Sequence, residues 1–173
     1  MEIKNFPNSE VQTITLLETI NNALAKLGST SKWKRPPEFF EDYEPLKDKI
    51  VVMVDDVKTI LENFAPHLIM ATAGKASFIE FTGQQLDELI EQIMAFNPNI
   101  VVMDYHLSDH LKGTSVIKAL RMKNFSGEAV GFSSDNHTAR EFLDAGAIGF
   151  VDKSAHSPED SVKKLAQVIS KIE

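Results

Sequence analysis

Polar side chains suited to catalysis follow four short apolar runs of this sequence. Asp55 and Asp56 follow the first run, and Asp104 follows the second. Ser133 and Lys153 lie at or just after the ends of the other two. Short apolar runs bounded by polar residues are typical of strands buried on both faces of a parallel sheet. Because the carboxyl ends of parallel strands lie along one edge, these five side chains are expected to meet there.

Three carboxylates, a hydroxyl and an ammonium form a combination that suits phosphoryl transfer. Clustered carboxylates repel one another, so at neutral pH they need a nearby cation or raised pKa values. Carboxylate oxygens together with water suit Mg²⁺. A transferring phosphoryl group carries negative charge on three oxygens, which a metal ion, a lysine and a hydroxyl can stabilise. An aspartate can also attack phosphorus itself. From the residues alone, Asp104 is a nucleophile, a ligand or a loop cap.

Apolar periodicity predicts alternating strands and helices from Lys49 onward. Strands are predicted at residues 50–54, 78–81, 100–104, 129–133 and 148–151, and helices at 57–71, 86–94, 114–123, 139–146 and from 157 to at least 169. This alternation predicts an α/β fold with a five-stranded parallel sheet covered on both faces. Pro66 predicts a kink or break after Phe64. A strand at residues 67–70 is the weaker alternative, because it leaves residues 78–81 unplaced.

Residues 1–48 are predicted to be an amphipathic helix followed by a linker. Apolar residues recur at three- and four-residue steps between Ser9, a suitable helix start, and Gly28, a suitable helix end. This helix must bury its apolar stripe, either on the domain that follows or against a second copy of the chain. Three prolines within residues 29–48 predict a linker without regular elements. Its four aromatic residues either pin it to the domain or bind a partner.

The composition argues against several classes of protein. A formal net charge of −7 does not favour binding to nucleic acid or to an anionic membrane. The absence of cysteine excludes disulfides and thiolate metal sites. No apolar run has the length needed to span a bilayer, and the first residues lack a signal-peptide pattern. A cytoplasmic protein with neither a nucleic-acid nor a membrane partner is expected.

Four stretches, at residues 51–56, 100–107, 131–134 and 149–153, together resemble the receiver domain of two-component response regulators. The resemblance covers residues 49–173, so the predicted domains are 1–48 and 49–173. It implies a flavodoxin-like three-layer sandwich with the sheet order 2-1-3-4-5, a choice that periodicity alone leaves open.

The resemblance implies a metal-assisted phosphoacceptor site. Asp104 would accept the phosphoryl group. Mg²⁺ would be held by Asp56 directly, by Asp55 mainly through bound water, by Asp104, and by the backbone carbonyl of His106. The donor would be a phosphohistidine on a histidine kinase or a histidine phosphotransfer protein.

The resemblance also implies a signalling switch, not an enzyme acting on a separate substrate. Ser133 and Lys153 would contact the phosphoryl group, and Ser133 and Phe150 would be the switch residues. Phosphorylation would shift a two-state equilibrium and change the binding of a protein partner. The alternatives are a Mg²⁺-dependent phosphatase-like enzyme with an aspartyl-phosphate intermediate and a degenerate receiver that only binds.

Two features depart from the family pattern. Ser154 follows the lysine where the family usually has proline, and the loop from Tyr105 to Gly113 is longer than usual. The N-terminal helix suggests a further hypothesis. It would form a homodimer, or it would cover the face made by the fourth helix, fifth strand and fifth helix of the domain until Asp104 is phosphorylated.

Overall fold

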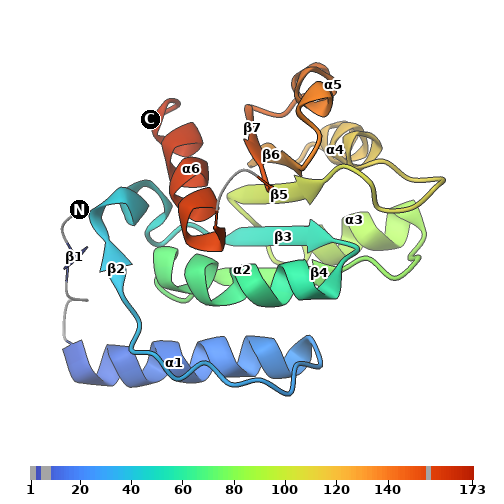
Figure 1. Ribbon diagram of the computed structural model, residues 1–173. Coiled ribbons are helices and arrows are strands. Elements are labelled where there is room, and N and C mark those ends of the chain that lie inside the picture. Colours follow the sequence, from blue (N-terminus) through green and yellow to red (C-terminus); the bar gives the residue numbers. More distant parts are fainter. Residues whose placement is uncertain (1–2, 5–8, 155–156) are drawn as a thin grey trace.

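A five-stranded parallel sheet forms the centre of the computed structural model, which describes residues 3–4, 9–154 and 157–173 (Figure 1). Its strands are β3 (Val51–Asp55), β4 (Ala76–Glu80), β5 (Ile100–Asp104), β6 (Glu128–Ser133) and β7 (Gly149–Asp152). They lie in the order β4-β3-β5-β6-β7, and every neighbouring pair is parallel. Counted within the domain this order is 2-1-3-4-5, as the family resemblance implied.

Helices cover both faces of the sheet and complete the predicted three-layer sandwich (Figure 1). They are α2 (Lys58–Ala71), α3 (Leu86–Met94), α4 (Gly113–Met122), α5 (Ala139–Ala145), preceded by the short helix η2 (Asn136–Thr138), and α6 (Pro158–Ser170). The helices α2 and α6 lie on one face, and α3, α4 and α5 lie on the other. Among the described residues, no helix is long and apolar enough to cross a membrane.

The sheet is buried on both sides because alternate residues of each strand face different helices. Val51 and Met53 pack with α2 and α6, whereas Val52 and Val54 pack with α3 and α4. All four side chains are fully buried. This two-sided burial explains why the strand sequences are continuous apolar runs instead of alternating ones.

Pro66 does not break α2, so of the predicted kink or break after Phe64 the break is wrong. The helix is continuous from Lys58 to Ala71, and Pro66 itself is buried within it. Eight residues of α2 are buried, and this packing outweighs the loss of one backbone hydrogen bond at proline. Residues 67–70 belong to the same helix, which excludes the alternative strand there.

The N-terminal helix α1 (Ser9–Lys26) packs on α2, along the outside of the sandwich (Figure 1). Its stripe of Leu16, Ile20 and Leu24 is buried in the same cluster as the inner side of α2. Gly28 ends the helix with a positive φ of 78°, as its position predicted. The hypothesis that this helix covers the α5–β7–α6 face is therefore wrong, because its apolar stripe is already buried on α2.

The segment predicted to be an irregular linker contains regular structure and belongs to the core. The strand β2 (Phe39–Phe40) pairs antiparallel with β1 (Ile3–Lys4) and leads into the short helix η1 (Glu41–Leu46). Tyr43 and Leu46 of η1 are fully buried against α2 and α6. The prolines shape this segment without preventing its docking, because burial of these apolar side chains stabilises it. The prediction that its aromatic residues pin it to the domain is correct.

Two hydrogen bonds between the Asn21 side chain and the Trp33 backbone hold the chain before β2 against α1. The backbone N–H of Trp33 donates to Asn21 Oδ1 at 2.8 Å, and Asn21 Nδ2 donates to the Trp33 carbonyl at 3.2 Å. The Trp33 ring meets the His67 ring of α2 edge-on, with 5.6 Å between centroids. The chain between α1 and β2 is thus fixed to both helices.

Replacing Leu46 with alanine tests whether η1 is part of the core. We expect Leu46→Ala to lower the free energy of unfolding by about 2–5 kcal/mol, because a fully buried leucine leaves a cavity. Leu143→Ala is the matched control, since Leu143 is 50% exposed and should cost less than about 1 kcal/mol. Urea denaturation measures both, and equal effects would contradict the docking of η1.

Candidate functional site

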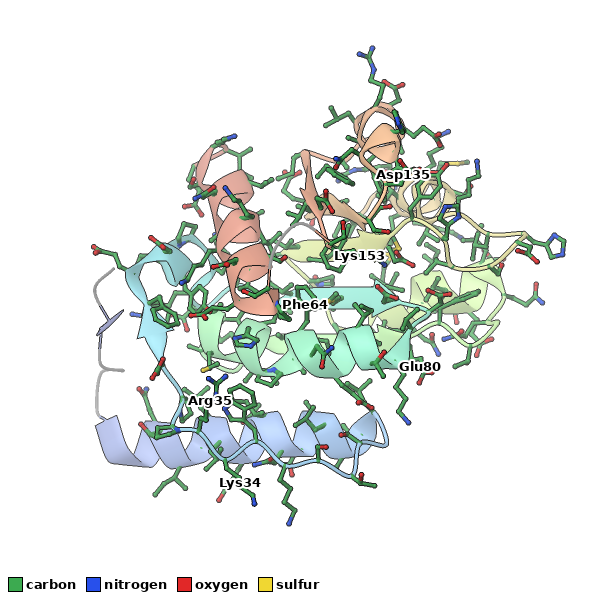
Figure 2. All side chains as sticks on the ribbon, in the orientation of Figure 1. Lys34, Arg35, Phe64, Glu80, Asp135 and Lys153 are labelled. Atoms are coloured by element: carbon green, nitrogen blue, oxygen red, sulfur yellow. The ribbon has the colours of Figure 1, made fainter. Side chains whose placement is uncertain are left out.

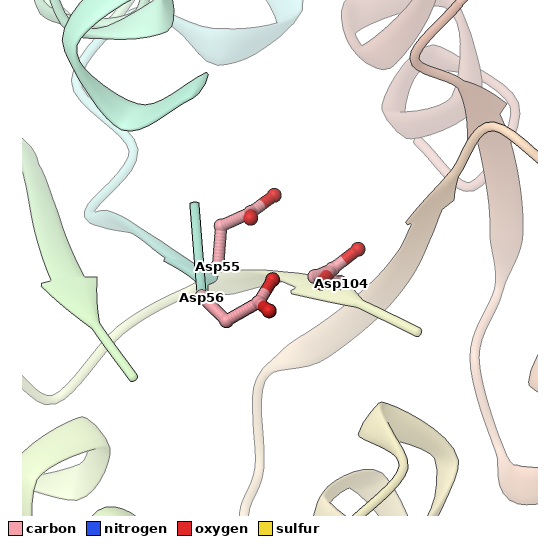
Figure 3. A group of neighbouring side chains, drawn as sticks. All are labelled: Asp55, Asp56 and Asp104. Carbon is pink, nitrogen blue, oxygen red and sulfur yellow. The ribbon is translucent and has the colours of Figure 1, made fainter. Parts of the chain in front are cut away.

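Three carboxylates meet where β3 and β5 end (Figure 3). Asp55 is the last residue of β3, Asp56 follows it, and Asp104 ends the neighbouring strand β5. One oxygen from each of the three lies within 4.8 Å of the others. Asp55 and Asp104 are buried, whereas Asp56 is exposed. The predicted meeting of these side chains at one sheet edge is therefore observed.

Lys153, labelled in Figure 2, reaches this cluster from the edge of the sheet that β7 forms. It follows β7, and its Nζ lies 2.6 Å from Asp104 Oδ1 and 3.2 Å from Asp55 Oδ2. Its backbone N–H donates to the Ser133 carbonyl at 3.1 Å, so the residue is fixed at its main chain too. One ammonium group thus links two buried carboxylates from two strands.

Burial and crowding change the protonation of these groups. Burial, with the neighbouring Asp55 charge, raises the pKa of Asp104 to about 7 from its ordinary 3.8. Burial also raises the pKa of Asp55, although the Lys153 charge opposes this. For Lys153 itself, burial lowers the pKa, but the hydrogen bond to Asp104 and both carboxylate charges outweigh burial and raise it. Lys153 is therefore a charged ammonium, and it forms ion pairs with both Asp55 and Asp104.

Asp55 and Ser133 also have structural roles in their own turns. Asp55 Oδ1 accepts a hydrogen bond of 2.8 Å from the Val57 N–H, just before α2 begins. Ser133 Oγ accepts one of 3.1 Å from the Asp135 N–H after β6. These bonds hold both side chains at the sheet edge. The Asp55 carboxylate therefore stabilises the turn that leads into α2, which has no side-chain cap, and it also belongs to the acidic cluster.

The loop after Asp104 is closed by backbone contacts that sequence reasoning did not identify. His106 and Lys112 form a β-bridge, and the Gly113 N–H donates to the Tyr105 carbonyl at 2.7 Å. A Cβ at Gly113 would lie 1.8 Å from the Asp104 carbonyl oxygen, so no other residue fits there without displacing that strand end. The place of Gly113 between a polar loop and a helical pattern is the sequence signal for this close approach.

Phe150, an expected switch residue, lies on β7. Ser154, which stands where the family usually has proline, lies in the turn after that strand. Phe150 is partly buried, and its ring centroid is 6.1 Å from that of Phe142 on α5. Both the N–H and the hydroxyl of Ser154 donate to Asp152 Oδ1, at 2.9 Å and 2.8 Å. This compact turn follows Lys153 at the position where the family pattern has proline.

The cluster has the charge and the donor atoms that a hard divalent cation requires. When ionised, the three carboxylates outnumber the single ammonium, and every available side-chain ligand atom is an oxygen. Exposed Asp56 lies at the open side of the group, where an ion and its waters would enter. The residues present therefore fit Mg²⁺, with Asp55, Asp56 and Asp104 as the side chains that would hold it.

Solved structures with the same fold include receiver domains. The receiver domain of the histidine kinase CKI1 from Arabidopsis thaliana, complexed with Mg²⁺ and BeF₃⁻, aligns with a TM-score of 0.58 at 20% identity, covering 76% of this chain and 93% of that one. The receiver domain of NtrX from Brucella abortus aligns at 0.57 and 19%, covering 69% and 98%. A LuxR-family response regulator from Aurantimonas aligns at 0.55 and 20%, covering 70% and 84%.

Sequence comparison assigns the family directly. No curated protein is similar enough in sequence to match. The family model of the response regulator receiver domain matches residues 51–166, which is more than half of the chain and spans all five strands of the sheet. With the sheet order and the acidic cluster described above, this match shows that the chain belongs to the response regulator receiver domain family.

Proposed function

We propose that the protein is a phosphorylation switch that accepts a phosphoryl group on Asp104 from a phosphohistidine. The observation that carries the proposal is Lys153 bridging Asp104 and Asp55 inside an acidic cluster. The donor is a histidine kinase or a histidine phosphotransfer protein. The readout is altered binding of a protein partner in the cytoplasm, so the chain acts on its own aspartate and not on a diffusible substrate.

The reaction forms one bond to phosphorus and breaks another. An Asp104 carboxylate oxygen attacks the phosphorus of a phosphohistidine whose other ring nitrogen is protonated. The bond from phosphorus to the donor nitrogen breaks, leaving neutral imidazole and an acyl phosphate. Bound Mg²⁺ would neutralise charge on the phosphoryl oxygens, held by Asp55, Asp56, Asp104 and the backbone carbonyl of His106.

Lys153 and Ser133 stabilise the product. Lys153 Nζ, 2.6 Å from Asp104 Oδ1, exchanges that partner for a phosphoryl oxygen without a large movement. The Ser133 hydroxyl donates a hydrogen bond to a second phosphoryl oxygen, while its oxygen still accepts a hydrogen bond from the Asp135 N–H. Movement of Ser133 toward the phosphoryl group makes room for Phe150, and these two residues are the proposed switch.

We propose that residues 1–48 and residues 49–173 have different functions. The extension is packed on α2 and α6, away from α3, α4 and α5. We propose that residues 49–173 carry the chemistry and that residues 1–48 stabilise this unit. Pairing of two copies through the remaining surface of α1 is the proposed route to a homodimer.

Phosphorylation by a small donor tests the assignment. Acetyl phosphate with Mg²⁺ should add one phosphoryl group per chain, detected by intact-mass spectrometry, and EDTA should prevent it because the ion is chelated. Asp104→Asn should abolish the adduct, since an amide oxygen does not form the acyl phosphate. Asp109→Asn, an exposed neighbour in the same loop, is the matched control and should label like the wild type. Repeated turnover of small phosphate esters would instead support the phosphatase-like alternative.

The raised pKa of Asp104 predicts how stability depends on pH without divalent cations. Folding favours the protonated form of Asp104, so this stabilisation is fully present below about pH 3.8 and is lost as the pH rises through about 7. Asp104→Asn removes the titration. At pH 8 it should therefore raise the free energy of unfolding by roughly 1–4 kcal/mol, and near pH 4 the gain should disappear.

Urea denaturation at several pH values, in EDTA, measures this difference. Asp109→Asn again serves as control and should show no pH-dependent gain. A stability gain for Asp104→Asn that is the same at pH 4 and pH 8 would contradict a raised pKa at Asp104.

A further inference from the structure

Tyr105, which follows the proposed phosphoacceptor Asp104, is hydrogen-bonded to the helix α5. Tyr105 Oη donates to Glu141 Oε2 at 2.6 Å, a short bond to a charged acceptor. Tyr105 is 4% exposed, whereas Glu141 is an exposed residue in the first turn of α5. The pair joins the chain next to Asp104 directly to α5. Neither residue belongs to the acidic cluster.

Packing holds the Tyr105 ring between α5 and its own loop. Its centroid lies 5.7 Å from Phe142 on α5 and 4.6 Å from the His106 ring, both edge-on. Lys112 Nζ lies 5.4 Å from the same ring, on the loop that closes against Asp104. Any displacement of the main chain at Asp104 is therefore passed to a ring that already contacts α5.

The helix α5 depends on such contacts for its position. It has only seven residues, which is too short for a helix to be stable by itself. Phe142 and Ala145 are its buried residues, and Phe142 packs directly over Gly131 of β6. Apolar packing of this kind permits sliding, because it has little directionality. The hydrogen bond to Tyr105 is directional and fixes one end of the helix.

We propose that the Tyr105–Glu141 hydrogen bond is a latch that holds α5 in the arrangement of the unphosphorylated protein. Resting on the proposed function, this adds a second connection from Asp104 to α5, separate from Ser133 and Phe150. A phosphoryl group adds negative charge and bulk at Asp104, next to the Tyr105 peptide, and favours release of Glu141. Coupling of this kind is reciprocal, so loss of the latch also changes ligand affinity at the acidic cluster.

Amide hydrogen exchange of α5 tests the latch with a variant that removes only the hydroxyl. In Tyr105→Phe we expect the amides of Ala139–Ala145 to exchange roughly five- to tenfold faster than in the wild type, the effect of losing one typical hydrogen bond to an exposed partner. In the wild type, Mg²⁺ with beryllofluoride should produce a similar increase. In the variant this further increase should be largely absent.

The chain supplies a matched control, because it contains only two tyrosines. Tyr43→Phe removes a hydroxyl from a fully buried ring in η1, on the opposite face of the sheet. It should leave exchange in α5, and its response to beryllofluoride, as in the wild type. An equal effect of both substitutions would indicate general destabilisation and would overturn the proposal.

A double-mutant cycle with Glu141→Ala, which removes the side-chain acceptor of the Tyr105 hydroxyl, isolates the pair. The double variant should show no faster exchange in α5 than Tyr105→Phe alone, because both changes remove the same bond. Each single variant should also bind Mg²⁺ with beryllofluoride several-fold more tightly than the wild type, by reciprocity. Additive effects, or unchanged exchange in both single variants, would overturn the latch.

Failure of the latch is distinguishable from failure of the phosphoacceptor assignment. If the wild type forms no acyl phosphate with acetyl phosphate, the assignment of Asp104 fails whatever α5 does. If Asp104 is phosphorylated and α5 in Tyr105→Phe exchanges like the wild type, only the latch is wrong.

Discussion

The attraction between one ammonium and two buried carboxylates is the interaction on which the rest of the site depends. Asp55 and Asp104 end adjacent strands and are themselves buried, so two like charges there are costly. Lys153 relieves this repulsion only because β7 ends two strands away and its side chain spans the gap. The cluster still carries an excess of negative charge. This excess of negative charge is what makes the residues of the cluster fit a divalent cation.

The strand order brings Asp55 and Asp104, which are distant in sequence, close enough for their charges to repel each other. Strands β3 and β5 are neighbours at the centre, so their last residues are forced together, while β6 brings Ser133 beside them. Helices on both faces seal the strands and leave only their carboxyl ends accessible. A change of one residue in register would move each aspartate to a different face of the sheet and dissolve the cluster.

The residues alone were sufficient for the strands and the acidic cluster, because strand ends are encoded by abrupt changes from apolar to charged residues. Asp104 at the end of a five-residue strand is the clearest case. The order of the strands was predicted only from the family resemblance. The extension was harder to predict, since proline content argued against regular structure and did not reveal that Tyr43 and Leu46 are buried. The same limit applies to Pro66, whose local effect is outweighed by packing of α2. Partners such as Glu141, remote in sequence and exposed, carry no local signal of their contact with Tyr105.

The docking of η1 against α6 has a consequence for how the chain acquires its structure. These two elements are in contact, yet every strand of the central sheet lies between them in sequence. Such non-local contacts slow folding, because a large loop must close, at a cost in entropy, before these contacts stabilise the structure. The side chains of η1 that contact α6 are therefore not fully covered until α6 has formed and packed, although α2 can cover part of the segment earlier. During synthesis that interval is a period of vulnerability to aggregation, which ends when the last helix covers them.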